Sequence, residues 1–174
     1  MKNMSKFIDL NYVKKEQKSF VEHLKCIEGI NYQESKFEVP MWLTLALLSE
    51  LIEVLNETKI HKWWDRSPVN EERLKEELAD LLSHLGNLAN ELDIDLIASV
   101  EETQTTSLEK QFIYIAYKIT TLPWRKMFGK HKLDTLIVKY VELVYSLGFD
   151  MEEIREAYFN KMKENYLNPK FMES

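Results

Sequence analysis

Turn-forming residues are scarce in this sequence: only four glycines and four prolines occur in 174 residues. Tight hairpins need such residues at fixed positions, so few hairpins can be built from this chain. Leucine, glutamate, lysine and alanine, which favour helices, are plentiful instead. A chain of this length can bury one substantial core but not two independent ones. The sequence therefore predicts one all-α domain over residues 1–174, folded as a helical bundle.

The breaks between helical stretches predict about six helices. Pro40 is expected in the first turn of the second helix, where a proline is tolerated. Capping residues mark the starts of later helices, and glycines mark several ends. The expected helices are Lys6 to about Glu28, ending at Gly29; a second from Pro40 past Val54; a third from the N-cap Asn70 to about Leu92; a fourth from the capping pair Thr106 and Glu109 to Pro123; a fifth from about Lys132 to Leu147, ending at Gly148; and a sixth from the capping pair Asp150 and Glu153 to Asn168 and Pro169.

Charge and cysteine content limit the expected partners and compartment. With 29 acidic against 23 basic side chains and a net charge of -6, the chain lacks the basic excess that binds a nucleic-acid backbone. The most apolar stretch, Pro40 to Leu55, is interrupted by Glu50 and Glu53, short of the roughly 20 apolar residues of a membrane-spanning helix. The single cysteine, Cys26, excludes an intramolecular disulfide and is expected to pack as a small apolar residue. We therefore expect a cytoplasmic protein with no membrane or nucleic-acid partner.

Two pairs of carboxylates occupy unexpected positions on the second and third helices. Residues three apart share a helix face, so Glu50 with Glu53, and Glu77 with Asp80, each present two carboxylates in one direction. Each pair is in register with an apolar stripe that should face the core, namely Leu43, Leu47 and Val54 for the first and Leu74, Leu81 and Leu88 for the second. Burying an unpaired carboxylate is costly, so a cation is expected to compensate these charges.

The ligand chemistry of these pairs favours Mg²⁺. Oxygen ligands alone suit a hard cation that binds a few carboxylates and takes further oxygens from water and substrate phosphates. No histidine or cysteine joins either pair, which disfavours softer metals and a di-iron site. Such a site activates water and neutralises phosphate oxygens. We therefore predict Glu50, Glu53, Glu77 and Asp80 as catalytic and metal-binding residues, with phosphoanhydride hydrolysis as the chemistry.

The same acidic spacing also has a purely structural interpretation. Acidic pairs three apart are common on solvated helix faces, and Asp150 with Glu153 is another such pair here. The apolar stripes would then form only a bundle or dimer interface, and the protein would be a helical interaction module without activity. His84, on a leucine-rich face, is expected to pack with its hydrogen bonds satisfied. Catalysis is favoured because both pairs fall inside apolar stripes on consecutive long helices.

The motifs Glu50-x-x-Glu53 and Glu77-x-x-Asp80 resemble the metal-binding signature of the all-α NTP pyrophosphatases, the MazG-like superfamily, and in particular of the dimeric all-α dUTPases. Three other segments are similar to that family and extend the resemblance over most of the chain. They are Gln17-Lys18-Ser19-Phe20 with Leu24, Asn56 with Lys62-Trp63-Trp64, and Ser146-Leu147-Gly148-Phe149-Asp150 with Tyr158, Lys161 and Asn165.

This resemblance implies a homodimer that hydrolyses dUTP, and often dUDP, to dUMP with Mg²⁺. It implies that Gln17 helps to recognise uracil and that the nucleotide is also contacted by Asn56, Lys62, Trp64, Lys161 and Asn165. The chain departs from the family at Val21, Ser83 and Asn168-Pro169-Lys170, where the family usually has an aspartate, a histidine and an arginine-containing segment. A pyrophosphatase for another or a modified nucleotide is therefore the second hypothesis.

Overall fold

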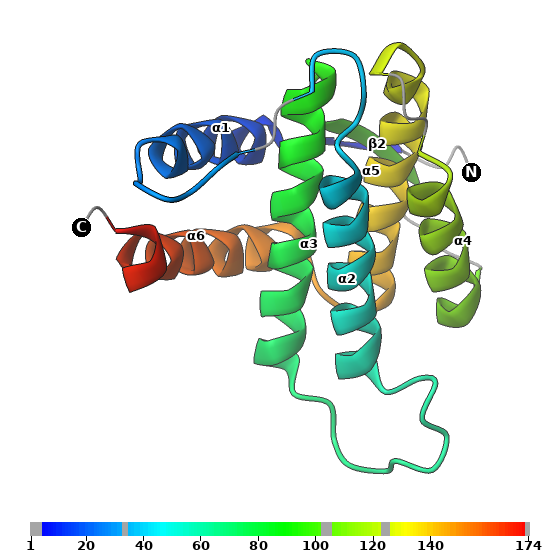
Figure 1. The fold of residues 1–174 in the computed structure, drawn as a ribbon. Coiled ribbons are helices and arrows are strands. Elements are labelled where there is room, and N and C mark those ends of the chain that lie inside the picture. Colours follow the sequence, from blue (N-terminus) through cyan, green and yellow to red (C-terminus); the bar gives the residue numbers. More distant parts are fainter. Residues whose placement is uncertain (1–4, 33–34, 102–105, 123–125, 173–174) are drawn as a thin grey trace.

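The computed structural model describes residues 5–32, 35–101, 106–122 and 126–172, and its fold is helical with one small two-stranded sheet (Figure 1). The predicted all-α class is confirmed, and the described residues contain six α-helices. No helix in the described ranges is long and apolar enough to cross a membrane. The elements are β1 (Ser5–Asp9), α1 (Asn11–Lys25), α2 (Met41–Thr58), α3 (Glu71–Leu92), β2 (Ile97–Glu101), α4 (Leu108–Thr120), the 3₁₀ turn η1 (Lys126–Phe128), α5 (Gly129–Ser146), α6 (Met151–Leu167) and the 3₁₀ turn η2 (Pro169–Phe171).

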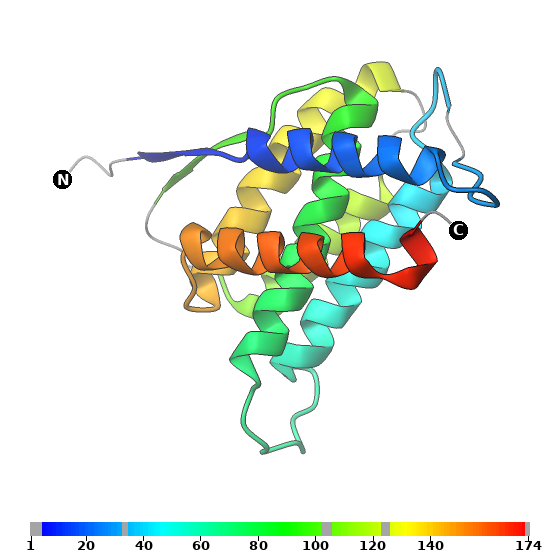
Figure 2. The same ribbon diagram turned by 90° about the vertical axis from the view of Figure 1, so that its left-hand side faces the viewer.

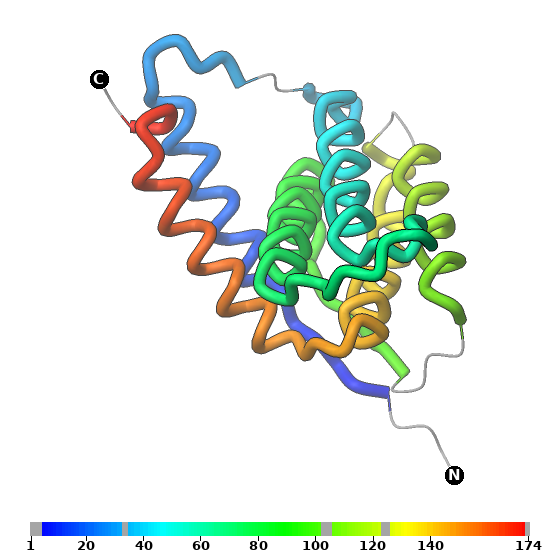
Figure 3. Tube along the Cα trace, turned by 90° about the horizontal axis from the view of Figure 1, so that it is seen from below, coloured from blue at the N-terminus to red at the C-terminus, as the bar shows by residue number. Residues whose placement is uncertain are grey.

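The central helix is α3, which packs against α1, α2, α5 and α6. The helices α2, α3, α4 and α5 run side by side as a bundle, whereas α1 and α6 lie across one side of α3 (Figures 1 and 2). The view from below in Figure 3 shows α1 and α6 as a separate layer beside that bundle. Leu74, Leu81 and Leu88 of α3 are at most 3 % exposed, as their apolar register predicted. Side chains on α3 therefore face neighbouring helices in several directions.

A glycine in α3 allows α1 to approach closely. A Cβ atom on Gly86 would lie 2.7 Å from Cγ1 of Val13 and 3.1 Å from Cγ of Gln17. One turn further along α3, the Asn90 side chain donates a hydrogen bond of 2.8 Å to the backbone oxygen of Lys14. These contacts fix α1 against α3 and hold Gln17 near the middle of α3.

Most predicted helix ends agree with the structure. The Asn70 side chain caps α3 by accepting a hydrogen bond from the Arg73 amide, and Asp150 with Glu153 forms the predicted capping box of α6. The pair Thr106 and Glu109 was predicted to cap α4, but the N-cap is Ser107 and its side chain makes no capping hydrogen bond, so this prediction was wrong. The predicted end of this helix at Pro123 lies outside the described residues.

The N-terminal residues form a strand instead of the start of the first helix. β1 pairs antiparallel with β2, from Ser5 opposite Glu101 to Asp9 opposite Ile97. Placing Lys6 to Leu10 in the first helix was therefore wrong. A partner strand some ninety residues away determines the conformation here, and the short segment carries no local signal of it.

The environment of Cys26 also differs from the prediction. This residue is exposed at the C-cap of α1 and does not pack as a buried apolar residue. Its thiol donates a hydrogen bond of 3.4 Å to the backbone oxygen of Glu22, within the last turn of the helix.

Candidate metal centre and adjoining cavity

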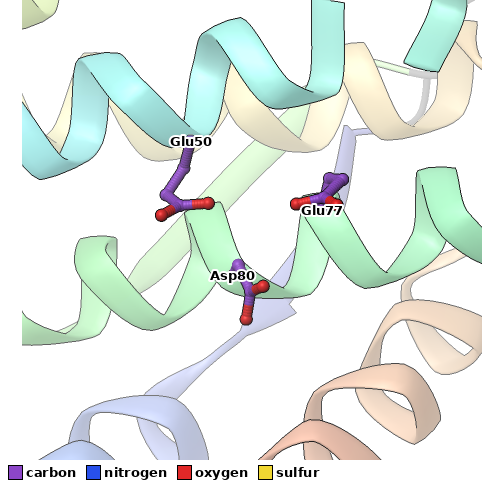
Figure 4. Close-up of side chains that lie close together, drawn as sticks. All are labelled: Glu50, Glu77 and Asp80. Atoms are coloured by element: carbon purple, nitrogen blue, oxygen red, sulfur yellow. The ribbon is translucent and has the colours of Figure 1, made fainter. Parts of the chain in front are cut away.

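Carboxylates from two helices converge at the centre of the molecule. Glu50 reaches from α2 toward α3, which carries Glu77 and Asp80 on successive turns (Figure 4). One oxygen atom from each of the three side chains lies within 4.8 Å of the other two. The residue Glu77 is buried, and the Glu50 and Asp80 side chains are 23 % and 21 % exposed. Three of the four predicted ligands thus meet in one place.

The fourth predicted ligand, Glu53, lies one turn further along α2 and is exposed. It does not belong to the cluster of converging oxygens. Its charge nonetheless acts on the site, because Glu53 contributes to the raised pKa values of Glu50 and Glu77. Its role as a ligand remains a prediction.

Burial and like charge make this cluster hard to ionise. Burial, and after it the charges of Asp80, Glu77 and Glu53, raise the pKa of Glu50 to about 7 against the opposing effect of Lys161. Burial also raises the pKa of both Glu77 and Asp80. Additional positive charge beside these carboxylates would favour their ionised forms.

Two basic side chains already compensate part of this charge. Nη2 of Arg73 lies 2.9 Å from Oε1 of Glu77, and Nζ of Lys161 lies 2.9 Å from Oδ2 of Asp80. Neither Arg73 nor Lys161 forms an ion pair with Glu50. Within the described residues, the basic atom that lies near the Glu50 carboxylate is Nε2 of His84, at 3.8 Å. Burial lowers the pKa of His84 to about 4, so this imidazole is neutral near pH 7. The oxygen-only cluster therefore fits a hard divalent cation such as Mg²⁺.

A cavity of about 590 Å³ adjoins the carboxylates, within the usual range for small-molecule sites. Its floor is α3, and its walls come from α1, α2, α6 and the residues that follow α1 and α6. The lining combines carboxylates, amides and a lysine with several aromatic rings. It comprises Gln17, Phe20, Val21, Leu24, Ile30, Asn31, Tyr32, Trp42, Glu50, Asp80, Ser83, His84, Asn87, Lys161, Asn165 and Phe171. This composition can hold a flat polar ring and a charged group together.

A second cavity, of about 640 Å³, lies on the other side of α1. Its lysines are largely offset by neighbouring acids, as in the pair of Lys126 with Glu91 at 2.6 Å. It contains none of the converging carboxylates. The cavity beside Glu50 and Asp80 is therefore the candidate functional site, although it is the smaller of the two.

The predicted substrate-binding residues fall into two groups. Gln17 from α1 and Lys161 with Asn165 from α6 line the cavity beside the carboxylates. Lys161 and Asn165 are one turn apart, so both reach the same side of α6. Sequence motifs separated by more than a hundred residues are thus brought together on one wall.

The remaining three predicted contacts lie elsewhere. Asn56 is in the last turn of α2, and Lys62 and Trp64 belong to the loop that connects α2 to α3. This loop extends beyond the end of the bundle (Figure 1), and the Trp64 residue is 64 % exposed. None of the three lines the cavity. Their contacts with substrate remain predictions.

Several cavity residues were not expected from the sequence. The Asn87 side chain is only 8 % exposed, and its Oδ1 atom has no hydrogen-bond partner among the described residues. Nδ1 of His84 also has no hydrogen-bond partner among the described residues. The prediction that His84 packs with its hydrogen bonds satisfied was therefore wrong. Asn87 lies seven residues after Asp80 on the same face of α3. This spacing could have identified Asn87 as a cavity residue from the sequence. Arg73 had a similar signal, four residues before Glu77.

In this helical protein, a cluster of carboxylates lies beside a cavity lined by aromatic rings. Such a site suits an anionic ligand that contains a flat ring and binds the carboxylates through a cation. The family model described as dUTPase matches residues 9–168. The chain therefore belongs to the all-α dUTPase family, as its motifs suggested. Family membership supports a hydrolase of the nucleotide pyrophosphatase type that acts on dUTP. The comparison with curated proteins finds no match.

Proposed function

We propose that this protein is a Mg²⁺-dependent pyrophosphatase that hydrolyses dUTP to dUMP and pyrophosphate. The observation that carries the proposal is the convergence of Glu50, Glu77 and Asp80 at the edge of an aromatic cavity. A nucleoside triphosphate joins a flat base to a polyanion, and this site offers a matching environment for each end. Glu53 is proposed as the fourth ligand, because it lies one helical turn from Glu50 and its charge already acts on Glu50 and Glu77.

The side chains of the site have separable roles in this proposal. Mg²⁺ held by the carboxylates would neutralise phosphate oxygens and make a bound water more acidic. One carboxylate of the cluster would accept a proton from the attacking water. The Lys161 ammonium has three donors, so it can contact a phosphate oxygen while it stays close to Asp80.

The base would occupy the aromatic part of the cavity. Trp42, His84 and Phe171 line it, and aromatic faces stabilise a stacked base by about 1–3 kcal/mol each. Gln17 and Asn87 supply amides for the polar edge of the base, and Asn165 lies near the phosphate-binding Lys161. Asn56, Lys62 and Trp64 remain proposed contacts from the end of α2 and the following loop.

We also propose a cytoplasmic homodimer that can use dUDP as a second substrate. A dimer is supported by exposed apolar side chains on α2 and α4, which a second copy would cover. A reducing compartment is consistent with the single cysteine of the sequence.

The decisive experiment measures pyrophosphate release from a panel of nucleoside triphosphates, with and without Mg²⁺. We expect release from dUTP only when Mg²⁺ is present, and almost none from dCTP or dATP. Equal activity on dCTP or dATP would instead indicate a broader or different nucleotide specificity. Absence of release from every nucleotide, together with no stabilisation by Mg²⁺, would support the helical interaction module.

Matched variants connect the activity to the carboxylates. Glu77→Gln keeps the shape of a buried side chain and removes its charge, so turnover should fall by at least about a thousandfold while the fold is retained. Glu153→Gln in the capping box of α6 serves as a control at another acidic pair and should keep full activity. Loss of folding in Glu77→Gln would assign this residue a structural role.

A further inference from the structure

The Gln17 side chain is held in one orientation by two residues of α6. It is only 3 % exposed, and its Nε2 atom donates to the Tyr158 hydroxyl at 3.1 Å and to the Met162 sulfur at 3.2 Å. Both partners are themselves buried, with exposures of 0 % and 2 %. The two hydrogens of the amide group are therefore both used within the protein.

The two partners constrain the amide differently. A tyrosine hydroxyl can donate or accept, so Tyr158 would tolerate either the nitrogen or the oxygen of the amide. A thioether sulfur can only accept, so Met162 requires the nitrogen. A flipped amide would place Oε1 against the sulfur, with two acceptors in contact. Met162 is thus the residue that determines which end of the amide faces α6.

The fixed orientation leaves the Gln17 carbonyl available to a ligand. No hydrogen bond to Oε1 is found within the described ranges, and Gln17 lines the cavity beside the carboxylates. A donor on a ligand in this cavity could therefore pair with the Gln17 carbonyl oxygen. The cavity therefore offers a hydrogen-bond acceptor of defined direction to whatever base it holds.

We propose that Met162 is a positioning residue for base selection, because it fixes the Gln17 amide with its carbonyl toward the base. The proposal rests on the proposed function, in which this cavity binds the base of a nucleotide. Uracil has a hydrogen on N3 and can donate to that carbonyl. Cytosine has a lone pair at N3, which would face the carbonyl oxygen as a second acceptor. A site built in this way rejects the wrong base by leaving polar groups unpaired.

The test compares kcat/KM for dUTP and dCTP in the intact protein and in three variants. Met162→Leu conserves volume and removes the acceptor, so the amide can turn and accept cytosine. We expect the ratio of dUTP to dCTP activity to fall roughly fivefold to tenfold, mainly through faster dCTP hydrolysis, as loss of about 1 kcal/mol of discrimination implies. Met151→Leu, also on α6 but beside a different cavity, should leave the ratio unchanged.

Tyr158→Phe separates the proposal from a general packing effect. This variant removes one partner of the amide and keeps the sulfur, so activity on both nucleotides should fall while their ratio stays within about twofold. An unchanged ratio in folded Met162→Leu, or a relaxed ratio in Tyr158→Phe alone, would overturn the role of Met162. Neither result would affect the proposed function, which fails only if the unaltered protein releases no pyrophosphate from dUTP. Thermal unfolding of each variant confirms that the fold is retained.

Discussion

The Glu50 carboxyl on α2 faces Glu77 and Asp80 across a partly buried space, and its pKa of about 7 reflects that burial and those charges. At high pH, the folded protein would be more stable with an uncharged side chain of similar shape at this position. Such an arrangement is expected where a carboxylate is kept for chemistry at the expense of stability. The cost should be measurable, because the protonation of Glu50 differs between the folded and unfolded chain.

The first prediction concerns the pH dependence of stability in the metal-free protein. Glu50 titrates near 4.5 when unfolded and near 7 when folded, so the folded state binds more protons between these values. The free energy of unfolding should therefore fall as the pH rises from about 5 to about 8, by roughly 1–2 kcal/mol after allowance for solvent screening. Chemical denaturation at several pH values would measure the change.

Glu50→Gln is the control for this pH effect. The variant lacks the titrating group, so its pH dependence over the same range should be flatter. Excess Mg²⁺ should reduce the loss of stability in the unaltered protein, because the ion binds ionised carboxylates and stabilises the folded state. A metal-free protein that becomes more stable as the pH rises would contradict the assigned environment of Glu50.

A second prediction at this scale concerns the unpartnered amide of Asn87. Leucine has a similar size and needs no hydrogen bonds, so Asn87→Leu should stabilise the protein by about 1 kcal/mol. If the amide contacts the base, the same variant should raise KM for dUTP roughly tenfold with a smaller change in kcat. Denaturation and steady-state kinetics would measure both effects. A less stable variant with unchanged KM would instead indicate a purely structural amide.

At the scale of elements, the contact of α1 with α3 depends on Gly86. A methyl group there would meet Val13 at 2.7 Å, so Gly86→Ala should displace α1 and destabilise the protein by about 1–2 kcal/mol, despite the better helix propensity of alanine. Because Gln17 follows on the same helix, kcat/KM for dUTP should also fall. Denaturation curves and kinetics of the variant would measure both effects.

The source of this destabilisation can be tested with a compensating change. Val13→Ala removes the methyl group that Gly86→Ala would meet, so the second substitution should cost less in the Val13→Ala background than alone. A cost that is equal in both backgrounds would show that the close contact with Val13 is not responsible.

The helices were predictable from the sequence because their signals are local. Apolar stripes such as Leu74, Leu81 and Leu88, and caps such as Asn70 and the pair Asp150 with Glu153, lie within single helices. The strands β1 and β2 were missed because each is stable only through pairing with the other. Their five-residue segments carry too little alternation to be distinguished from helix or loop.

The candidate site was predictable in part for the same reason. Spacing within single helices, and register with apolar residues, indicated all three clustered carboxylates, Glu50, Glu77 and Asp80. The exposure of Glu53 could not be inferred, because a helix face is wide enough for two residues three apart to differ in burial. The cavity walls depend on how α1 and α6 cross α3, and no spacing within a single helix specifies that arrangement.

At the scale of the whole molecule, two neighbouring helices expose large apolar side chains to solvent. On α2, Met41, Leu45 and Ile52 are 78 %, 64 % and 46 % exposed, and the neighbouring α4 exposes Ile113 and Tyr117 by 71 % and 58 %. Large exposed apolar side chains gathered on neighbouring helices can mark a site of protein association. A second copy of the chain is the occupant that the proposed homodimer requires.

The last prediction tests this surface as the dimer interface. Leu45→Glu combined with Ile113→Glu places two charges on it, and burying unpaired charge in an interface is strongly unfavourable. Sedimentation should therefore change from dimer to monomer, whereas Leu167→Glu, at an equally exposed apolar residue at the end of α6, should leave a dimer. A double variant that still sediments as a dimer would place the interface elsewhere. The carboxylates and the cavity lining come from one chain, so the monomer should still bind dUMP, and loss of binding would mean that the partner completes the site.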